Sequence, residues 1–206
     1  MGYIGNNCNS WIFISCGGNN STCNITSPFN VITTNLFPYT MIKCDFSFES
    51  FRNLYLANSI FSDTDFTKAY IINSDMSNSD FSKSIMIETN LKFITSNNVN
   101  FFNVNFTKAD LGGVTLTNSN LDETSFDDAN LSGTDFTGSS FVNSSLKNVD
   151  LRGAKLHNVD LSNANLENAD LDGASLLNAI VNNTVLTNTK KNCINHEICF
   201  NELTSE

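Results

Sequence analysis

An apolar residue at every fifth position is the feature that most restricts how this 206-residue chain can fold. Of the 29 positions counted in fives from Phe46 to Leu186, 28 hold Leu, Phe, Ile, Met or Val, and Ser96 is the exception. The residue two positions earlier is Ala, Ser, Thr, Cys or Val in 26 of the 29 repeats. Each group of five therefore offers one large apolar and one small side chain for burial.

A period of five matches neither a regular helix nor a flat strand. On an α-helix the apolar stripe would drift around the axis, and in a strand successive fifth residues would point to opposite faces. A bend in the same sense every five residues satisfies the pattern. Asn and Gly dominate two positions after the apolar residue, and both tolerate the left-handed conformations of such bends. The chain is therefore predicted to coil, and its coils to stack through backbone hydrogen bonds.

The repeated motif resembles that of a known family. Segments such as ADLGG (109–113), ANLSG (129–133) and VDLRG (149–153) are similar to the A-(D/N)-L-x-x motif of pentapeptide repeat proteins. The resemblance covers about residues 44–189 in unbroken phase. It implies an all-β fold, a right-handed quadrilateral parallel β-helix of four repeats per coil and roughly seven coils in total.

The 20-residue coil implied by this resemblance predicts which apolar residues stack on one another. Two inner ladders rich in aromatic residues are expected. One contains Phe61, Phe81, Phe101, Leu121 and Phe141, and the other contains Phe46, Phe66, Met86, Phe106 and Phe126.

The segments that flank the repeats are predicted to cap the open ends of the stack, because unpaired strand edges need cover. Residues 1–43 are expected to form an irregular or β-containing N-terminal cap. Residues 190–206 are expected to form a C-terminal cap, in which Asn195 begins a short helix that carries Ile198 and Leu203.

The charge of the chain limits its partners. The formal net charge is −10, which argues against direct nucleic-acid binding because nucleic-acid binders carry a basic face. A basic protein partner remains compatible with this charge. The longest compact apolar run, residues 11–14, is far shorter than the roughly 20 residues that span a bilayer, so no membrane insertion is expected.

The N-terminus lacks the basic and apolar regions of a signal peptide. This absence favours the cytoplasm. A secreted protein or a virion or assembly context stays open if the six cysteines are paired.

One spacing of cysteines and histidine could hold a metal: Cys193-x-x-His196-x-x-Cys199. A zinc site needs four ligands, or three and an open position, and no CxxC pair accompanies this motif. The alternatives are a disulfide between Cys193 and Cys199, or free thiols. No metal or other cofactor is predicted.

The sequence contains no recognisable catalytic set. His157 follows Leu156 on the outside of the predicted coil, with no second histidine at a matching repeat, and is expected to face solvent. Aspartates in the repeats are expected to bond the nearby backbone of the turns. No Ser–His–Asp set, phosphate-binding loop or hydrolase motif is present. We therefore predict a non-catalytic structural or protein-interaction scaffold.

Acidic residues are concentrated in the second half, because residues 109–189 hold eleven acids and three bases. Some pentapeptide repeat proteins resemble duplex DNA in shape and charge, and bind type II topoisomerases such as gyrase. A DNA mimic is therefore the alternative hypothesis, against a solenoid that is acidic only to stay soluble. The predicted acidic partner-binding face consists of Asp110, Asp122, Glu123, Asp127, Asp128 and Asp135.

Large apolar residues occupy outward positions in the first half, where contiguous exposed groups would mark a contact surface. They are expected to bind another chain, to support self-association, or to be covered by the N-terminal segment. This predicted apolar face consists of Tyr55, Ile60, Tyr70, Ile72, Ile85, Ile87, Phe93 and Phe102. A third functional hypothesis, an exported assembly subunit braced by disulfides, follows from the cysteines.

The repeat is interrupted at one point, where Ser96 takes a buried position and Ile94 takes a small one. We expect a local bulge there, in which Ile94 fills the space beside Ser96 and the serine hydroxyl bonds the backbone. With Phe93 also apolar at an outward position, the distortion is expected near the apolar face.

Overall fold

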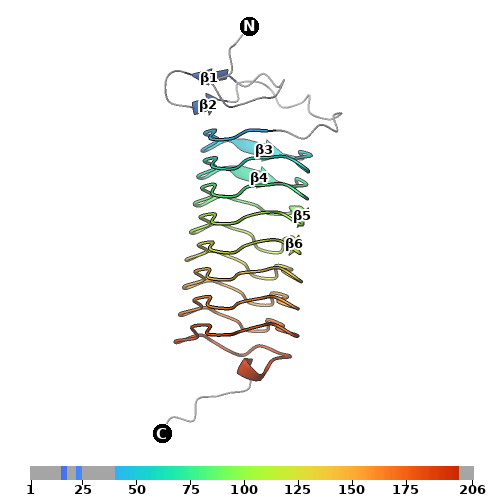
Figure 1. Cartoon of the computed structure of the whole chain (residues 1–206), viewed down its shortest axis with the longest axis vertical. Coiled ribbons are helices and arrows are strands. Elements are labelled where there is room, and N and C mark those ends of the chain that lie inside the picture. Colours follow the sequence, from blue (N-terminus) through green and yellow to red (C-terminus); the bar gives the residue numbers. More distant parts are fainter. Residues whose placement is uncertain (1–14, 18–21, 25–39, 200–206) are drawn as a thin grey trace.

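The chain forms a tall stack of coils with its two termini at opposite ends (Figure 1). The structure is a computed structural model and describes residues 15–17, 22–24 and 40–199. Most of the predicted N-terminal cap, residues 1–43, and Leu203 of the predicted C-terminal helix therefore lie outside the described residues.

Short elements stand out from the otherwise isolated bridges of the stack. Strands β1 and β2 pair antiparallel, whereas β3 pairs with β4, and β5 with β6, in parallel. Among the described residues, the one helical element is a 3-10 turn, η1. The bounds are β1 Ser15–Gly17, β2 Thr22–Asn24, β3 Ser50–Arg52, β4 Tyr70–Ile72, β5 Thr95–Asn97, β6 Thr115–Thr117 and η1 Glu197–Cys199.

The stack is held in a register of 20 residues. From Thr40↔Ile60 to Asp170↔Lys190, the bridges are parallel and join residues 20 apart. Each coil therefore contains four repeats, and equivalent repeats stack into four columns. We call these columns faces 1, 2, 3 and 4. They begin with the repeats centred on Phe46, Phe51, Leu56 and Phe61, and each continues at 20-residue intervals.

Left-handed turns produce the bend that the period of five requires. From Lys43 to Asn188, every residue two positions after the inward apolar residue has a φ between 52° and 74°. In many repeats the next N–H closes the turn, as when Ala69 donates to the Phe66 carbonyl at 2.9 Å. A positive φ at the third residue with this bond is typical of a type II turn. The predicted role of Asn and Gly in these bends is confirmed.

The apolar positions form a continuous core. All 29 positions of the repeat are buried except Val181 and Leu186, which are partly exposed in the last coil. The ring centroids of Phe61 and Phe81 lie 4.8 Å apart. Those of Phe106 and Phe126 lie 4.7 Å apart. The two predicted aromatic ladders are therefore confirmed.

The small inward position differs between the two halves of the stack. In the first half it often holds Ser or Thr, whose hydroxyl donates to the carbonyl of the large residue one coil earlier. Thr89 donates to Phe66 at 2.9 Å and Ser139 donates to Leu116 at 2.8 Å. From Val149 onward, through six further repeats, the position holds only Ala or Val, so these side-chain bonds between coils cease there.

The predicted bulge at Ser96 is wrong. Strand β5 pairs with β6 in the unbroken 20-residue register, with Ser96 opposite Leu116. Ile94 fills the small position at 2 % exposure, and Ser96 is fully buried with no hydrogen bond to its Oγ. A bulge would break backbone bonds to both neighbouring coils. The chain therefore keeps its ladder and leaves one hydroxyl unpaired.

The predicted cap of the C-terminal helix is also wrong. Asn195 has a φ of 66°, whereas an N-cap residue has an extended backbone. Its side chain donates to Ser175 Oγ at 3.0 Å. The side chain that caps η1 is His196, whose Nδ1 accepts a hydrogen bond from the Ile198 N–H at 3.3 Å.

Candidate interaction surfaces

The predicted apolar face is divided among all four faces of the stack. Five of its eight residues are exposed, and Ile72, Ile87 and Phe102 are half-buried. The register assigns them as follows: face 1, Ile85 and Ile87; face 2, Tyr70, Ile72 and Phe93; face 3, Tyr55; face 4, Ile60 and Phe102. Face 2 thus gathers the largest number of these residues.

Phe48, at the turn that leads into β3, adds to the apolar group on face 2. Its side chain is 70 % exposed, and Phe93 is 72 % exposed. Both have a left-handed φ, near 63° and 61°. Sequence reasoning missed Phe48, although an aromatic residue in place of Asn or Gly at the turn was a usable signal. We call Phe48, Tyr70, Ile72 and Phe93 the β3–β4 surface.

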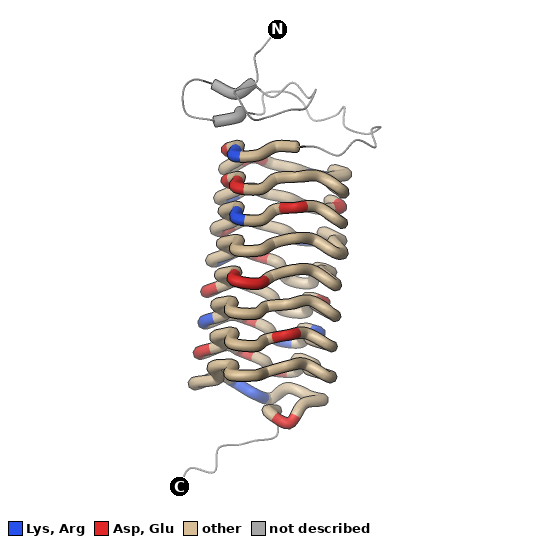
Figure 2. The backbone as a smooth tube through the Cα atoms, in the orientation of Figure 1, with Lys and Arg blue, Asp and Glu red and all other residues tan. Residues whose placement is uncertain are grey.

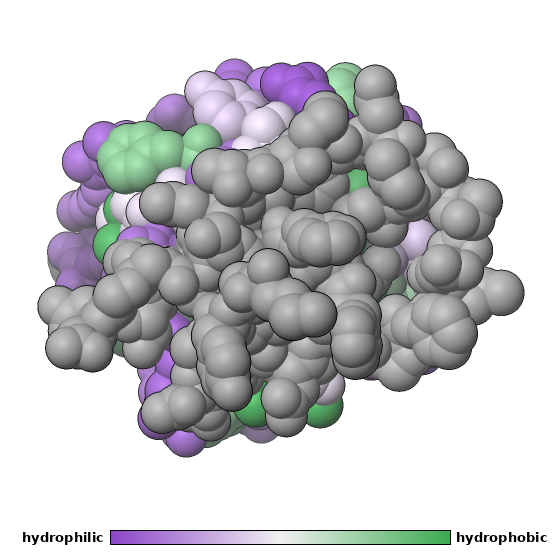
Figure 3. Space-filling model, turned by 90° about the horizontal axis from the view of Figure 1, so that it is seen from above, coloured by the Kyte–Doolittle hydropathy of each residue, from purple (hydrophilic) through white to green (hydrophobic). Residues whose placement is uncertain are grey.

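The rim of the first coils is mixed in character. Seen from the N-terminal end, hydrophobic and hydrophilic groups both border the residues that cover the centre of the view (Figure 3). Lys68 Nζ lies 5.8 Å from the centre of the Phe48 ring and 3.6 Å from Glu88 Oε2. The β3–β4 surface therefore has a charged border beside its aromatic groups.

The six predicted acidic residues are not gathered on one face. The register places them as follows: face 1, Asp127 and Asp128; face 2, Asp110; face 3, Asp135; face 4, Asp122 and Glu123. Acidic and basic residues are interspersed along the stack (Figure 2). Lys92 Nζ lies 2.7 Å from Asp110 Oδ2, and Lys155 Nζ lies 3.3 Å from Asp135 Oδ2.

Most of these carboxylates also hold the backbone. Asp110 accepts a hydrogen bond from the Gly112 N–H at 3.2 Å, within its own turn. Asp122 accepts one from the Val142 N–H, one coil on, at 2.8 Å. The prediction that repeat aspartates bond nearby backbone is confirmed, and it extends to bonds between coils.

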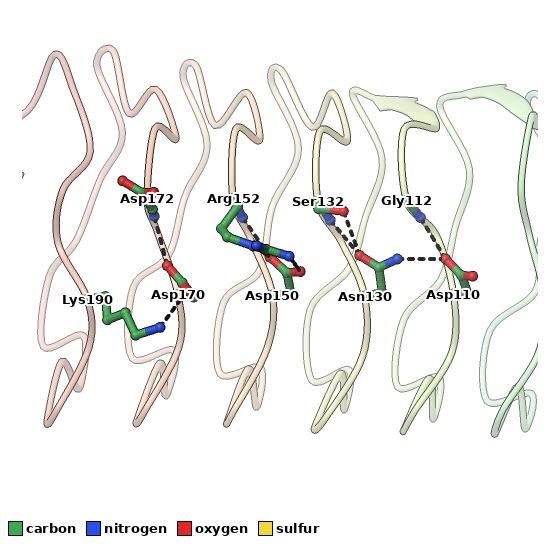
Figure 4. Close-up of polar contacts among 9 residues, drawn as sticks. All are labelled: Asp110, Gly112, Asn130, Ser132, Asp150, Arg152, Asp170, Asp172 and Lys190. Carbon is green, nitrogen blue, oxygen red and sulfur yellow. Dashed lines mark hydrogen bonds and ion pairs between the residues drawn. The ribbon is translucent and has the colours of Figure 1, made fainter.

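The longest polar ladder follows face 2 through the second half (Figure 4). Asn130 Nδ2 donates to Asp110 at 2.9 Å, and Lys190 Nζ donates to Asp170 at 2.7 Å. Arg152 donates to both oxygens of Asp150, at 2.9 and 2.6 Å. Sequence reasoning did not single out this ladder, although polar residues recur there every 20 residues.

These contacts change the acidity of three carboxyl groups. Hydrogen bonds from Arg152 lower the pKa of Asp150, and the hydrogen bond from Lys190 lowers the pKa of Asp170. Burial raises the pKa of Asp135, but its hydrogen bonds from Thr137 and Lys155 outweigh burial and leave it below its usual value. These acids are therefore ionised at neutral pH and engaged in structural contacts.

His157 is not simply a solvated side chain. Its Nε2 lies 2.7 Å from Ser175 Oγ on the next coil, and Asn195 also bonds that hydroxyl. Within residues 40–199, no carboxylate is hydrogen-bonded to the imidazole. The pair thus lacks the third member of a Ser–His–Asp set.

Cys193 and Cys199 are joined by a disulfide with an S–S distance of 2.05 Å. Thiolates are the form of cysteine that binds metal, so these two sulfurs are unavailable as ligands while the bond is intact. His196 Nε2 lies 3.1 Å from the Ala179 carbonyl. Among the described residues, no group of three His, Cys, Asp or Glu is placed to hold a metal ion.

A repeating turn, a buried apolar column and a 20-residue parallel register define the protein as a β-solenoid. The model of the family described as pentapeptide repeats matches eight copies over residues 50–188. The chain belongs to the pentapeptide repeat family.

Solved structures support the fold. A trypsin-treated variant of QnrB1, described as a plasmid-mediated fluoroquinolone resistance protein, aligns with a TM-score of 0.52 and 13% identity, over 81% of this chain and 86% of that chain. HetL, involved in heterocyst differentiation regulation in the cyanobacterium Nostoc, aligns with a TM-score of 0.42 and 24% identity, over 75% and 78%. No curated protein matches the sequence.

Over the part of the chain that the structure describes, no helix has the length and apolar character needed to cross a membrane.

Proposed function

We propose that the protein is a non-catalytic scaffold that binds another protein through the β3–β4 surface. Pentapeptide repeat proteins are generally scaffolds of this kind. The uninterrupted 20-residue register supports the proposal, because it holds side chains of successive coils in fixed relative positions.

The observation that carries the proposal is the pair of exposed phenylalanines, Phe48 and Phe93. A left-handed backbone is unfavourable for a bulky residue, and Asn or Gly holds most equivalent positions. Neither ring contributes to the core, since each is about 70 % exposed. Aromatic residues are enriched at protein interfaces. Side chains that cost stability without filling the core are best explained by contact with a partner.

Replacement of both residues by asparagine separates binding from folding. Asn suits the left-handed turn, so the Phe48→Asn/Phe93→Asn variant is expected to be at least as stable as the natural protein. Partners captured by the natural protein from its host should be lost, as measured by quantitative mass spectrometry. Lys83→Asn is the matched control, because Lys83 has the same turn position and a φ of 60°. Equal capture by the double variant would contradict the proposal.

The second candidate is an acidic DNA mimic that binds a type II topoisomerase. The surplus of eleven acids over three bases in residues 109–189 favours it, and so does the fold shared with QnrB1. The predicted acidic residues would then act from two adjacent faces, with Asp127 and Asp128 on face 1 beside Asp122 and Glu123 on face 4. A gyrase supercoiling assay, with and without a fluoroquinolone, tests this candidate. Neither inhibition nor protection at micromolar protein would refute it.

A third candidate is an exported assembly subunit braced by disulfides. The Cys193–Cys199 bond favours it, because disulfides persist in oxidising compartments. A thiol titration of the purified protein under denaturing, non-reducing conditions tests it. Six free thiols would remove its support.

We also propose the finer architecture: a right-handed quadrilateral β-helix of roughly seven coils, with caps at residues 1–43 and 190–206. Limited proteolysis tests these boundaries. Cleavage should concentrate outside residues 44–189, and rapid cutting within the repeats would contradict them.

A further inference from the structure

The last coil ends in an open strand edge. On the side that faces away from the stack, several backbone groups have no hydrogen-bond partner among the described residues. They are the N–H groups of Val181, Asn183, Leu186 and Asn188 and the carbonyls of Thr184 and Thr189. An edge of this kind is ready to pair with another strand.

The same end of the stack exposes apolar side chains. Ile180 and Val185, which flank the open edge, are 46 % and 42 % exposed, and the core residues Val181 and Leu186 are only partly covered. The turn that carries η1 covers another part of this end, since Ile198 and Cys199 pack against the core there. Faces 4 and 1 of the last coil are therefore the uncovered part.

We propose that this edge pairs with the same edge of a second copy of the chain, around a two-fold axis at Val185. On a strand edge, the Leu186 N–H and the Thr184 carbonyl point the same way on either side of Val185. Two such edges placed antiparallel bring Val185 opposite Val185. Each Leu186 N–H then donates to the Thr184 carbonyl of the second copy, as in a non-hydrogen-bonded antiparallel pair.

The distribution of charge favours a second copy meeting at this end rather than along the flanks. The chain as a whole has a net charge of −10, so two flanks repel one another. Residues 180–192 contain two bases, Lys190 and Lys191, and no acid. The two facing ends therefore bring together no acidic groups from this segment, and the aliphatic groups that meet are Ile180 and Val185.

Sedimentation velocity of the full chain, over a range of protein concentrations, tests the proposal. The natural protein is expected to reach twice its 22.7 kDa mass. Val185→Lys and Val185→Glu should each be monomeric, because two like charges would face one another across the axis. An equimolar mixture of the two variants should recover the dimer, since Lys then faces Glu.

Ile85→Lys is the matched control. Ile85 has the same repeat position on face 1, five coils earlier, and is 41 % exposed. It should leave the dimer unchanged, and circular dichroism should show that all variants fold. A natural protein that stays monomeric would overturn the proposal. A dimer that survives Val185→Lys, or a variant mixture that fails to associate, would overturn it as well.

Discussion

The two halves of the solenoid keep one backbone geometry with different cores. Between Phe46 and Phe141 the inward ladder is rich in phenylalanine, and hydroxyls at the small position often bond between coils. From Leu146 to Leu176 every large inward residue is Leu, and from Val149 the small one is Ala or Val. Both halves share the 20-residue register and the left-handed turns. The turn and the backbone ladder therefore set the coil, and the core residues only have to fill it.

The comparison breaks most severely if a charge enters the core of the second half. Leu151 is 1 % exposed, and Leu151→Asp would leave a carboxylate among apolar groups with no partner. We expect a loss of more than about 4 kcal/mol and of cooperative β-sheet unfolding, measured by thermal denaturation followed by circular dichroism. Leu151→Met is the control and should unfold nearly as the natural protein does. Equal stability of the Asp variant would show that Leu151 does not face inward.

Truncation of equivalent core residues compares the halves directly. Phe106 and Leu166 both lie on face 1, and only Phe106 stacks on another ring, that of Phe126. Phe106→Ala should cost about 3–5 kcal/mol, and Leu166→Ala should fall nearer the lower end of about 2–5 kcal/mol. Urea denaturation measures both. A larger loss for Leu166 would mean that the aromatic stack is not the stronger half of the core.

The unpaired hydroxyl of the first half offers a gain in stability. Ser96→Ala removes a buried group that has no hydrogen bond and should be neutral or stabilising by up to about 1 kcal/mol. Ser139→Ala is the matched control, because its hydroxyl donates to Leu116. That variant should lose about 1 kcal/mol. If Ser96→Ala proved the more destabilising of the two, Ser96 would have a partner.

The smallest expected effect concerns pH and the polar ladder of the second half. Because the folded pKa of Asp170 is lowered, its contribution to stability is present above the ordinary value of 3.8 and is lost as pH falls through the folded pKa. Lys190→Met should raise the Asp170 pKa toward 3.8, as measured by NMR titration of the carboxyl carbon. The stability change should be below about 1 kcal/mol, since the pair is partly exposed. An unchanged pKa would contradict the role given to Lys190.

Sequence reasoning predicted what depends on local pattern. The period of five located the inward residues and the turn residues, and Asn158 or Gly173 at a left-handed turn needs no tertiary information. The motif then implied the coil of four repeats, from which the Phe61 and Phe46 ladders followed.

What failed depends on the balance between interactions. At Ser96 the backbone ladder prevailed over a single hydroxyl, which no pattern could weigh. The acidic and apolar residues were grouped by nearness in sequence, yet a chain that turns every five residues sends neighbours to different faces. Asp122 and Asp135, for instance, lie on faces 4 and 3. Residues 20 apart, such as Asp150 and Asp170, are the true neighbours.

The central claim is that residues 20 apart are joined by backbone hydrogen bonds, and NMR couplings across hydrogen bonds test it most directly. In the isotope-labelled protein, the Leu131 nitrogen should couple to the carbonyl carbon of Asp150, since the Leu131 N–H donates to that oxygen at 2.8 Å. Phe106 and Ser125 should show the same offset of 19 residues, at 2.7 Å. Couplings at any other constant offset, or none between these pairs in the folded protein, would contradict the 20-residue coil.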